Sequence, residues 1–222
     1  MLQRLATVTV IVAVTIAAGT AGTGFSKVSP GTRTFTLNNS VGQNHIKFVS
    51  DAPMEKINGT AQGITGQFKL DPSKLEATTG SLSVSVRSMK TAISKRDEHM
   101  YSPMWLDADK YPSITYEVKG LKDVKVESHE GHRVAKGKAF GTFTCHGVSK
   151  PLTAAVTITY QPENDQTKKR ASGDLIMIDA KFEVPLAEYQ ITGKGDIIGS
   201  KVGETIQIEA ILYANSQQVI TN

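Results

Sequence analysis

Cysteine is almost absent from this sequence: Cys145 is the only one among 222 residues. A chain with a single thiol cannot form an internal disulfide, so its hydrophobic core must hold the fold without a covalent brace. We expect Cys145 to be a buried and unreactive thiol, with pairing between two chains as the less common alternative.

Aromatic residues and concentrated positive charge are also scarce. Phe, Trp and Tyr make up 6% of the chain, and the formal net charge is +4. Lysine and arginine are scattered, and the only short basic run is KKR at residues 168–170, in a segment that resembles a loop. A nucleic-acid-binding protein typically carries a basic stripe interleaved with aromatic side chains. The sequence therefore argues against a nucleic-acid partner.

Motifs of metal and hydrolytic chemistry are missing as well. The chain has no H-E-x-x-H, no Cys/His pair at zinc spacing, no G-x-S-x-G elbow and no glycine-rich phosphate loop. Cys145 and His146 lie in GTFTCHG, which is expected to be a strand whose successive side chains point to opposite faces. They therefore cannot act as a nucleophile and its base. His129, His132 and the glycine-rich segment 193–203 are interpreted as loops. We expect no catalytic residue, no metal ion and no cofactor.

The apolar stretch near the N-terminus is short. Arg4 is followed by an apolar run from Leu5 to Ala18 and then by small residues, which is the order of regions in a secretory signal peptide. A run of about 14 residues is shorter than the roughly 20 that a membrane-spanning helix needs. An uncleaved N-terminal anchor is the alternative, because no strong A-x-A cleavage site is present. The pattern predicts a signal peptide over residues 1–24 and a mature protein that is periplasmic or secreted.

What the rest of the chain does have is period-two alternation of apolar and polar residues. In SLSVSVRS, Leu82, Val84 and Val86 fall on one face, and serines and Arg87 fall on the other. Such alternation is typical of antiparallel strands with one face buried. The same pattern recurs at residues 45–48, 113–118, 124–126, 151–160, 175–184 and 204–213.

Turn-forming segments separate these runs. They are DPSKLEATTG, VKGLKD, SHEGH and PENDQ, at residues 71–80, 118–123, 128–132 and 162–166. We expect about eight to ten strands in one all-β sandwich or barrel domain over residues 30–215. An eight-stranded barrel would have an interior just wide enough for side chains or for one small ligand.

The segment SKRDEHMYSPMWLD, residues 94–107, interrupts the strand pattern. Ser94 and Asp97 have the spacing of a capping box at the start of a helix. We expect Asp97 to cap this helix, Arg96 to form an ion pair and His99 to hydrogen-bond a carbonyl. A catalytic role for these three residues is the alternative. A metal site is disfavoured, because neighbouring helical residues diverge.

A second short helical turn is expected to begin at Ser102 and Pro103 and to end before Pro112. The two helical segments, around residues 94–108, would pack apolar side chains onto the barrel. Those side chains are Met100, Met104, Trp105 and Leu106.

Several of these elements together resemble the YceI-like family of exported bacterial proteins. The resemblance rests on KRDEHMYSPMWLDADKYPSITYEV, KGKAFGTFTCHGVSKPLTAAVTI and the closing VGETIQIEAILYA, and it covers nearly all of the expected mature chain. The matching positions are Arg96, Asp97, His99, Met100, Tyr111, Pro112, Gly141, Phe143, Thr144, Gly147, Val148, Lys150 and Pro151, with Ile46, Phe48, Gly66 and Phe68 upstream. The sequence departs from the family at Asn44, often serine, at Cys145, commonly aliphatic, and in the insert 52–63.

The resemblance implies an antiparallel eight-stranded, lipocalin-like β-barrel whose interior holds a long apolar lipid of the isoprenoid type, such as a polyprenyl or quinone-like chain. The protein would then be an exported binding or carrier protein and not an enzyme. The expected ligand-binding residues, which equally describe a filled core, are Phe48, Phe68, Val84, Val86, Met100, Trp105, Tyr116, Val118, Ile158, Phe182, Ile206 and Ile208.

Two alternative functions stay open at this point. One is a metal-dependent enzyme that uses Arg96, Asp97 and His99. The other is an envelope stress protein that binds a protein partner. The sequence also leaves open whether the barrel pairs into a homodimer.

Overall fold

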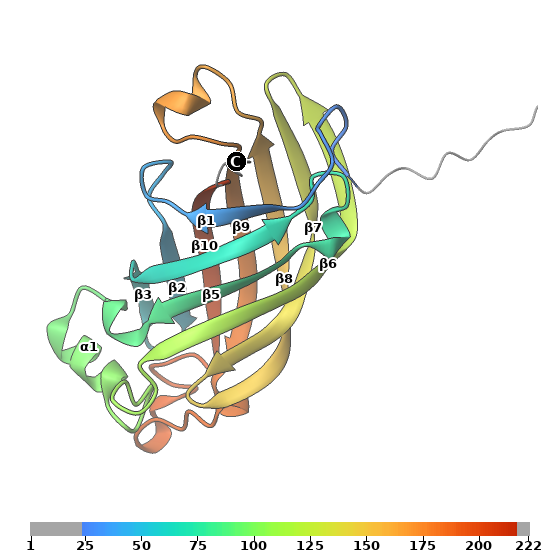
Figure 1. Cartoon of the computed structure of the whole chain (residues 1–222). Coiled ribbons are helices and arrows are strands. Elements are labelled where there is room, and N and C mark those ends of the chain that lie inside the picture. The colour runs from blue at the N-terminus through green and yellow to red at the C-terminus, as the bar shows by residue number, and fades with distance from the viewer. Residues whose placement is uncertain (1–23, 217–222) are drawn as a thin grey trace, which may run out of the picture.

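The computed structural model describes residues 24–216, so the expected signal peptide over residues 1–24 lies outside the described residues except for Gly24. Within this range the fold consists of ten antiparallel strands and one α-helix, α1 (Ser94–Tyr101) (Figure 1). The strands are β1 (Arg33–Leu37), β2 (His45–Asp51), β3 (Lys56–Ala61), β4 (Ile64–Leu70), β5 (Thr79–Ser85), β6 (Ser113–His129), β7 (His132–Cys145), β8 (Val148–Gln161), β9 (Leu175–Pro185) and β10 (Thr205–Ser216). Short 3-10 helices are η1 (Leu75–Ala77), η2 (Val86–Ser88), η3 (Thr167–Lys169), η4 (Leu186–Tyr189) and η5 (Gly195–Ile197).

Eight of these strands close into a barrel in the order β1-β4-β5-β6-β7-β8-β9-β10. Closure depends on β1, which pairs with β4 on one side and with β10 on the other. A closed barrel leaves few strand edges to solvent. The expectation of an all-β, antiparallel eight-stranded barrel is confirmed.

β10 changes partner along its length, and this creates room for an extra hairpin. Its first half, Ile206 to Ile211, pairs with β2, and its last residues, Ala214 to Ser216, pair with β1. At the switch, the Tyr213 N–H donates to Oδ1 of the buried Asn44 at 2.6 Å. The insert 52–63 forms β3 and its flanking turns, so the β2–β3 hairpin is an addition to the eight-stranded wall.

Alternating side chains fill the barrel interior, as the sequence indicated. In β8, Ala154, Val156, Ile158 and Tyr160 are all buried while the residues between them are more exposed. Aromatic rings add contacts across the interior, with centroids 5.5 to 6.4 Å apart among Tyr116, Phe143, Phe182 and Tyr189. Each methylene buried in such a core contributes about 0.8 kcal/mol.

The sequence misplaced one turn. VKGLKD does not separate two strands, because β6 runs unbroken from Ser113 to His129. Instead it contains irregularities in the pairing with β7, after Val118 and after Lys122, and Asp123 has a φ of 56°. Bulges use the same residue types as turns, so the sequence pattern alone could not distinguish them.

Two strands also end earlier than expected. β5 stops at Ser85, so Val86 lies in η2 and not on the strand face that carries Leu82 and Val84. β7 stops at Cys145, because His146 and Gly147 have φ values of 50° and 75° and form the two-residue turn into β8. The expected strand GTFTCHG is therefore wrong in its last two residues.

The segment between β5 and β6 contains α1, as expected, and a turn also begins at Ser102 and Pro103, although it does not become a second helix. Residues 102–111 form hydrogen-bonded turns and not a helix, with Trp105 N donating to Ser102 O and Tyr111 N to Asp107 O. In Figure 1, α1 lies at the same end of the barrel as the coil that follows β9. Between residues 24 and 216 no helix is long and apolar enough to span a membrane.

Candidate ligand-binding cavity

A cavity of about 640 Å³ lies at the end of the barrel beside α1, and we call it the mouth cavity. Its wall combines apolar side chains with a smaller number of polar ones. The apolar residues are Phe48, Ile57, Met89, Ile93, Met100, Met104, Trp105, Leu106, Leu186, Ile191, Ile197, Val202 and Ile206; the polar residues are Ser50, Glu55, Thr91, Lys95, Arg96, His99, Ser102, Lys194 and Lys201. Ile93 and Met104 are about half exposed, so the cavity reaches the protein surface.

Three parts of the chain form the mouth cavity: the β2–β3 hairpin, residues 89–106, and the segment from η4 to the start of β10. Two glycines allow close packing in this wall. A Cβ at Gly59 would lie 2.0 Å from the Phe48 ring, and a Cβ at Gly193 would lie 2.9 Å from the Trp105 ring. Gly193 also has a φ of 64°, which favours glycine.

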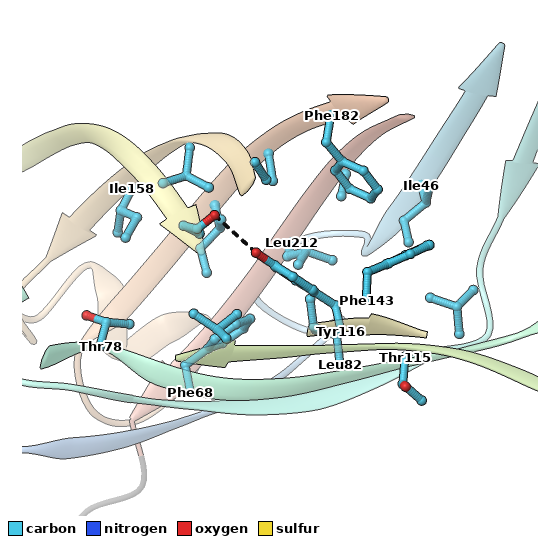
Figure 2. Close-up of a pocket in the computed structure, with 18 of the residues that line it drawn as sticks. Ile46, Phe68, Thr78, Leu82, Thr115, Tyr116, Phe143, Ile158, Phe182 and Leu212 are labelled. Carbon is cyan, nitrogen blue, oxygen red and sulfur yellow. Dashed lines mark hydrogen bonds between the residues drawn. The ribbon is translucent and has the colours of Figure 1, made fainter. Parts of the chain in front are cut away.

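A second, inner cavity lies in the barrel interior and measures only about 80 Å³ (Figure 2). Its wall is almost entirely apolar. The Tyr116 hydroxyl, drawn with its hydrogen bond in Figure 2, donates to the carbonyl of Ala139 at 3.0 Å. Burial raises the pKa of this phenol to about 12. The Thr78 hydroxyl has no hydrogen-bond partner among residues 24–216.

The two volumes have different consequences for ligand binding. Cavities that hold small molecules typically measure 300–1,000 Å³. The mouth cavity falls in this range, whereas the inner cavity is far too small for a lipid chain. The barrel interior of this structure is therefore mostly filled by its own side chains.

The residues expected to bind ligand divide between these two sites. Phe68, Val84, Tyr116, Val118, Ile158 and Phe182 line the inner cavity. Phe48, Met100, Trp105 and Ile206 line the mouth cavity. Val86 is buried in η2 and is absent from both linings. Ile208, also absent from both, pairs with Phe48 on one side and Phe182 on the other, so it lies between the two cavities.

The Arg96, Asp97 and His99 side chains do not converge on one point. Arg96 Nη1 lies 3.0 Å from Glu55 Oε1, which confirms the expected ion pair. Asp97 is buried and accepts hydrogen bonds of 2.7 Å from both the backbone N–H and the hydroxyl of Thr91. It therefore fixes the segment before α1, and the predicted capping box with Ser94 is wrong, because Ile93 occupies the N-cap.

His99 differs from the expectation as well. Its imidazole is exposed and forms no hydrogen bond with any described residue, so the predicted bond to a carbonyl is wrong. It faces the mouth cavity instead. No group of three or more His, Cys, Asp or Glu side chains in residues 24–216 is placed to hold a metal ion.

Cys145 and His146 point to separate environments. Cys145 is buried, and burial raises the pKa of its thiol to about 12, far from the range of a reactive nucleophile. His146 Nδ1 lies 3.0 Å from the carbonyl oxygen of Tyr189, in the turn after β7. The expectation of a buried thiol is confirmed.

The segment after β9 is the part of the wall that the sequence did not indicate. Residues 193–203 are expected to be only a loop, yet Ile197 and Val202 line the mouth cavity. Leu186 and Ile191, which precede that range, line it as well. Aliphatic residues within and just before the glycine-rich stretch were the available signal, because a purely solvated loop has no need of them.

Comparison with known proteins relates this barrel to a family. The model of the YceI-like domain matches residues 35–214. A UPF0312 protein of Pseudomonas putida is 29% identical over 139 residues, which are 63% of this chain and 66% of that protein. Protein YceI of Salmonella arizonae is 24% identical over 153 residues, which are 69% of this chain and 73% of that protein.

Solved structures share the fold. BcnA of Burkholderia cenocepacia superimposes with a TM-score of 0.61 and 19% identity, over 81% of this chain and 99% of that one. A polyisoprenoid binding domain from Saccharophagus degradans, implicated in plant cell wall breakdown, gives a TM-score of 0.55 and 14% identity, over 82% and 98%. With the family model matching most of the sequence, the chain belongs to the YceI-like family.

Proposed function

We propose that this protein is an exported binding and carrier protein for a lipid of the isoprenoid type. One observation carries the proposal: a largely apolar cavity of about 640 Å³ at the end of a closed barrel. The structural neighbour from Saccharophagus degradans, which is a polyisoprenoid binding domain, supports the same class of ligand. Export rests on the signal-peptide pattern of residues 1–24.

The physics of the cavity suits an apolar chain. An isoprenoid chain offers no hydrogen bonds, so its affinity must come from surface removed from water, at about 0.8 kcal/mol per buried methylene. Met100 supplies such surface from α1, Trp105 and Leu106 supply it from the turns that follow α1, and Ile206 supplies it from β10. Because the barrel interior is filled, the proposal places the chain in the mouth cavity and not along the barrel axis.

Neither alternative function gains an observation in its favour. The carboxylate of Asp97 binds Thr91 and the guanidinium of Arg96 binds Glu55, so neither group is directed at a common substrate or metal position. Among residues 24–216 the exposed large apolar side chains are Met54, Ile93, Met104 and Phe140, and two of them, Ile93 and Met104, line the mouth cavity itself. The homodimer stays a prediction, to be checked by measuring the oligomeric state in solution.

Two measurements test the proposal. Protein purified from a bacterial host is examined by native mass spectrometry and then extracted with organic solvent, and we expect a copurifying apolar lipid. In vitro, geranylgeraniol is titrated into delipidated protein while tryptophan emission is followed. Trp105 is the only tryptophan and lines the mouth cavity, so its emission reports occupancy.

A matched pair of variants locates the ligand. Met100→Gln replaces a thioether in the cavity wall with an amide of the same length, and we expect affinity to fall about fivefold. Met54→Gln makes the same change at a side chain that is 76% exposed and outside the lining, and it should have no effect. Equal affinities for both variants would contradict a ligand in the mouth cavity, and an absence of any binding would reject the proposed function.

A further inference from the structure

The polar part of the mouth cavity is strongly one-sided in charge. Its ionisable side chains are Lys95, Arg96, His99, Lys194 and Lys201 against a single acid, Glu55. Glu55 is already bound to Arg96 at 3.0 Å, and this pair is internally neutral. Apart from this pair, the charged side chains of the wall are Lys95, Lys194 and Lys201.

None of the three lysines forms an ion pair with any side chain in residues 24–216. They approach the cavity from two different elements: Lys95 from α1, and Lys194 and Lys201 from the coil between β9 and β10. All three are exposed, so their side chains can reorient toward a ligand.

The other polar side chains of the wall are already occupied, apart from His99. Ser50 Oγ accepts from Gly203 N, the Thr91 hydroxyl donates to Asp97, and the Ser102 hydroxyl donates to the carbonyl of His99. A ligand that enters the mouth cavity therefore meets an apolar wall and unpaired donors, nearly all of them cationic. A neutral headgroup gains no charge-assisted hydrogen bond from these lysines, which are exposed to water, whereas an anion does.

We propose that the ligand of the mouth cavity is an amphiphile with an anionic headgroup, held by Lys95, Lys194 and Lys201 while its apolar chain lies against the wall around Met100 and Trp105. This inference rests on the proposed function and specifies the chemical class of its ligand. Both the apolar wall and the lysines belong to one cavity, so chain and headgroup are bound together.

The test compares two ligands that share one apolar chain. Geranylgeraniol and geranylgeranyl phosphate are titrated separately, with Trp105 emission as the readout. We expect the phosphate to bind at least tenfold more tightly than the alcohol, which corresponds to about 1.4 kcal/mol. Added salt should weaken the binding of geranylgeranyl phosphate and leave the binding of geranylgeraniol unchanged, because salt screens the interactions of exposed charges.

A variant without two of these lysines, compared with a matched control, tests whether the lysines of the mouth cavity bind the phosphate group. The double variant Lys194→Gln, Lys201→Gln should lower affinity for the phosphate about tenfold and affinity for the alcohol by less than twofold, because only the phosphate loses charge-assisted hydrogen bonds. The control is Lys168→Gln, Lys169→Gln, which removes the same charge from η3, at the opposite end of the barrel from α1 in Figure 1. It should change neither affinity.

The outcomes separate the inference from the function on which it rests. Equal affinities for the alcohol and the phosphate in the unaltered protein would overturn the inference of an anionic headgroup. The proposal that the protein binds a lipid would stand. Binding of inorganic phosphate as tightly as geranylgeranyl phosphate would also overturn it, because the apolar chain would then contribute nothing. If neither lipid binds, the proposed function fails and the inference fails with it.

Discussion

Asp97 holds the start of α1 to the segment before it. The carboxylate is buried and accepts from both the backbone N–H and the hydroxyl of Thr91, at 2.7 Å each, while Lys90 Nζ lies 3.9 Å away. Ala92, between them, has a φ of 63°, and this left-handed residue turns Thr91 toward the helix. The side chain thus shapes one wall of the mouth cavity without entering it.

Replacing this carboxylate should therefore lower the stability of the fold without removing a side chain that lines the mouth cavity. We expect Asp97→Ala to lower the free energy of unfolding by about 2 kcal/mol, because the buried Thr91 N–H loses its acceptor. Glu98→Ala, an exposed neighbour on the same helix, should change it by less than about 0.5 kcal/mol. Urea unfolding of both variants measures this difference, and an Asp97→Ala protein as stable as Glu98→Ala would contradict the assignment.

The sequence indicated the ion pair of Arg96 but not the partner of Asp97, for a physical reason. A capping box considers only donors within the helix itself, whereas Asp97 binds a residue that a left-handed turn brings back toward it. The same limit applies to His99. Predicting a carbonyl partner for His99 would have required knowing which elements lie beside it. In the structure the ring faces the mouth cavity.

The coil between β9 and β10 forms one side of the mouth cavity. Gly193 brings this coil against Trp105, and the coil returns through Val202 to begin β10. Strand alternation predicted β9 and β10 well, because their inner residues recur at every second position over most of each strand. The coil has no such period, so its aliphatic residues gave no indication of which element they would contact.

Two glycines in this coil allow the effect of backbone strain to be distinguished from the effect of contact with Trp105. Gly193 and Gly195 have φ values of 64° and 60°, so alanine is strained at either position. Only at Gly193 would the new Cβ also meet Trp105, at 2.9 Å, since nothing lies within 4 Å of a Cβ at Gly195. We expect both alanine variants to lose about 1 kcal/mol of stability.

Only Gly193→Ala should in addition displace the Trp105 ring. Its tryptophan emission should shift relative to the unaltered protein, and its affinity for geranylgeraniol should change with it. Gly195→Ala should keep the original emission spectrum. Identical spectra for the two variants would show that the coil does not pack on Trp105.

At the scale of the whole molecule, two buried titratable groups should make the barrel less stable in alkali. Burial raises the pKa of the Cys145 thiol from its ordinary 9.0 to about 12, and that of the Tyr116 phenol from 10.0 to about 12. In both cases the folded state favours the neutral form. Their contribution to stability is complete below pH 9 and is lost as the pH rises from about 9 toward 12, because the unfolded chain releases the protons first.

Between pH 8 and pH 10 the thiol alone should lower the free energy of unfolding by roughly 1 kcal/mol. Urea unfolding at the two pH values measures this loss. In Cys145→Ala the thiol contribution is gone, so the decrease between the two pH values should be correspondingly smaller. A decrease of the same size in both proteins would mean that the thiol is not the group responsible.

Phe25 connects the predicted signal peptide to the barrel. The ring is 4% exposed and stacks on Tyr160 with centroids 5.2 Å apart, and its N–H donates to the carbonyl of Pro72 at 2.6 Å. Removing such a ring typically costs about 3 kcal/mol. A mature protein that had lost Phe25 would expose part of Tyr160, so processing should leave this residue in place.

We therefore expect the exported protein to begin at or before Phe25, which agrees with a signal peptide over residues 1–24. Expression with the native N-terminus, fractionation of the cells and intact-mass measurement of the periplasmic product check both export and the cleavage position. Phe25→Ala should lower the free energy of unfolding by about 3 kcal/mol, while Ser26→Ala, at the exposed next residue, should change it little. A mature chain that begins after Phe25, or an unprocessed chain retained in the cytoplasm, would contradict this prediction.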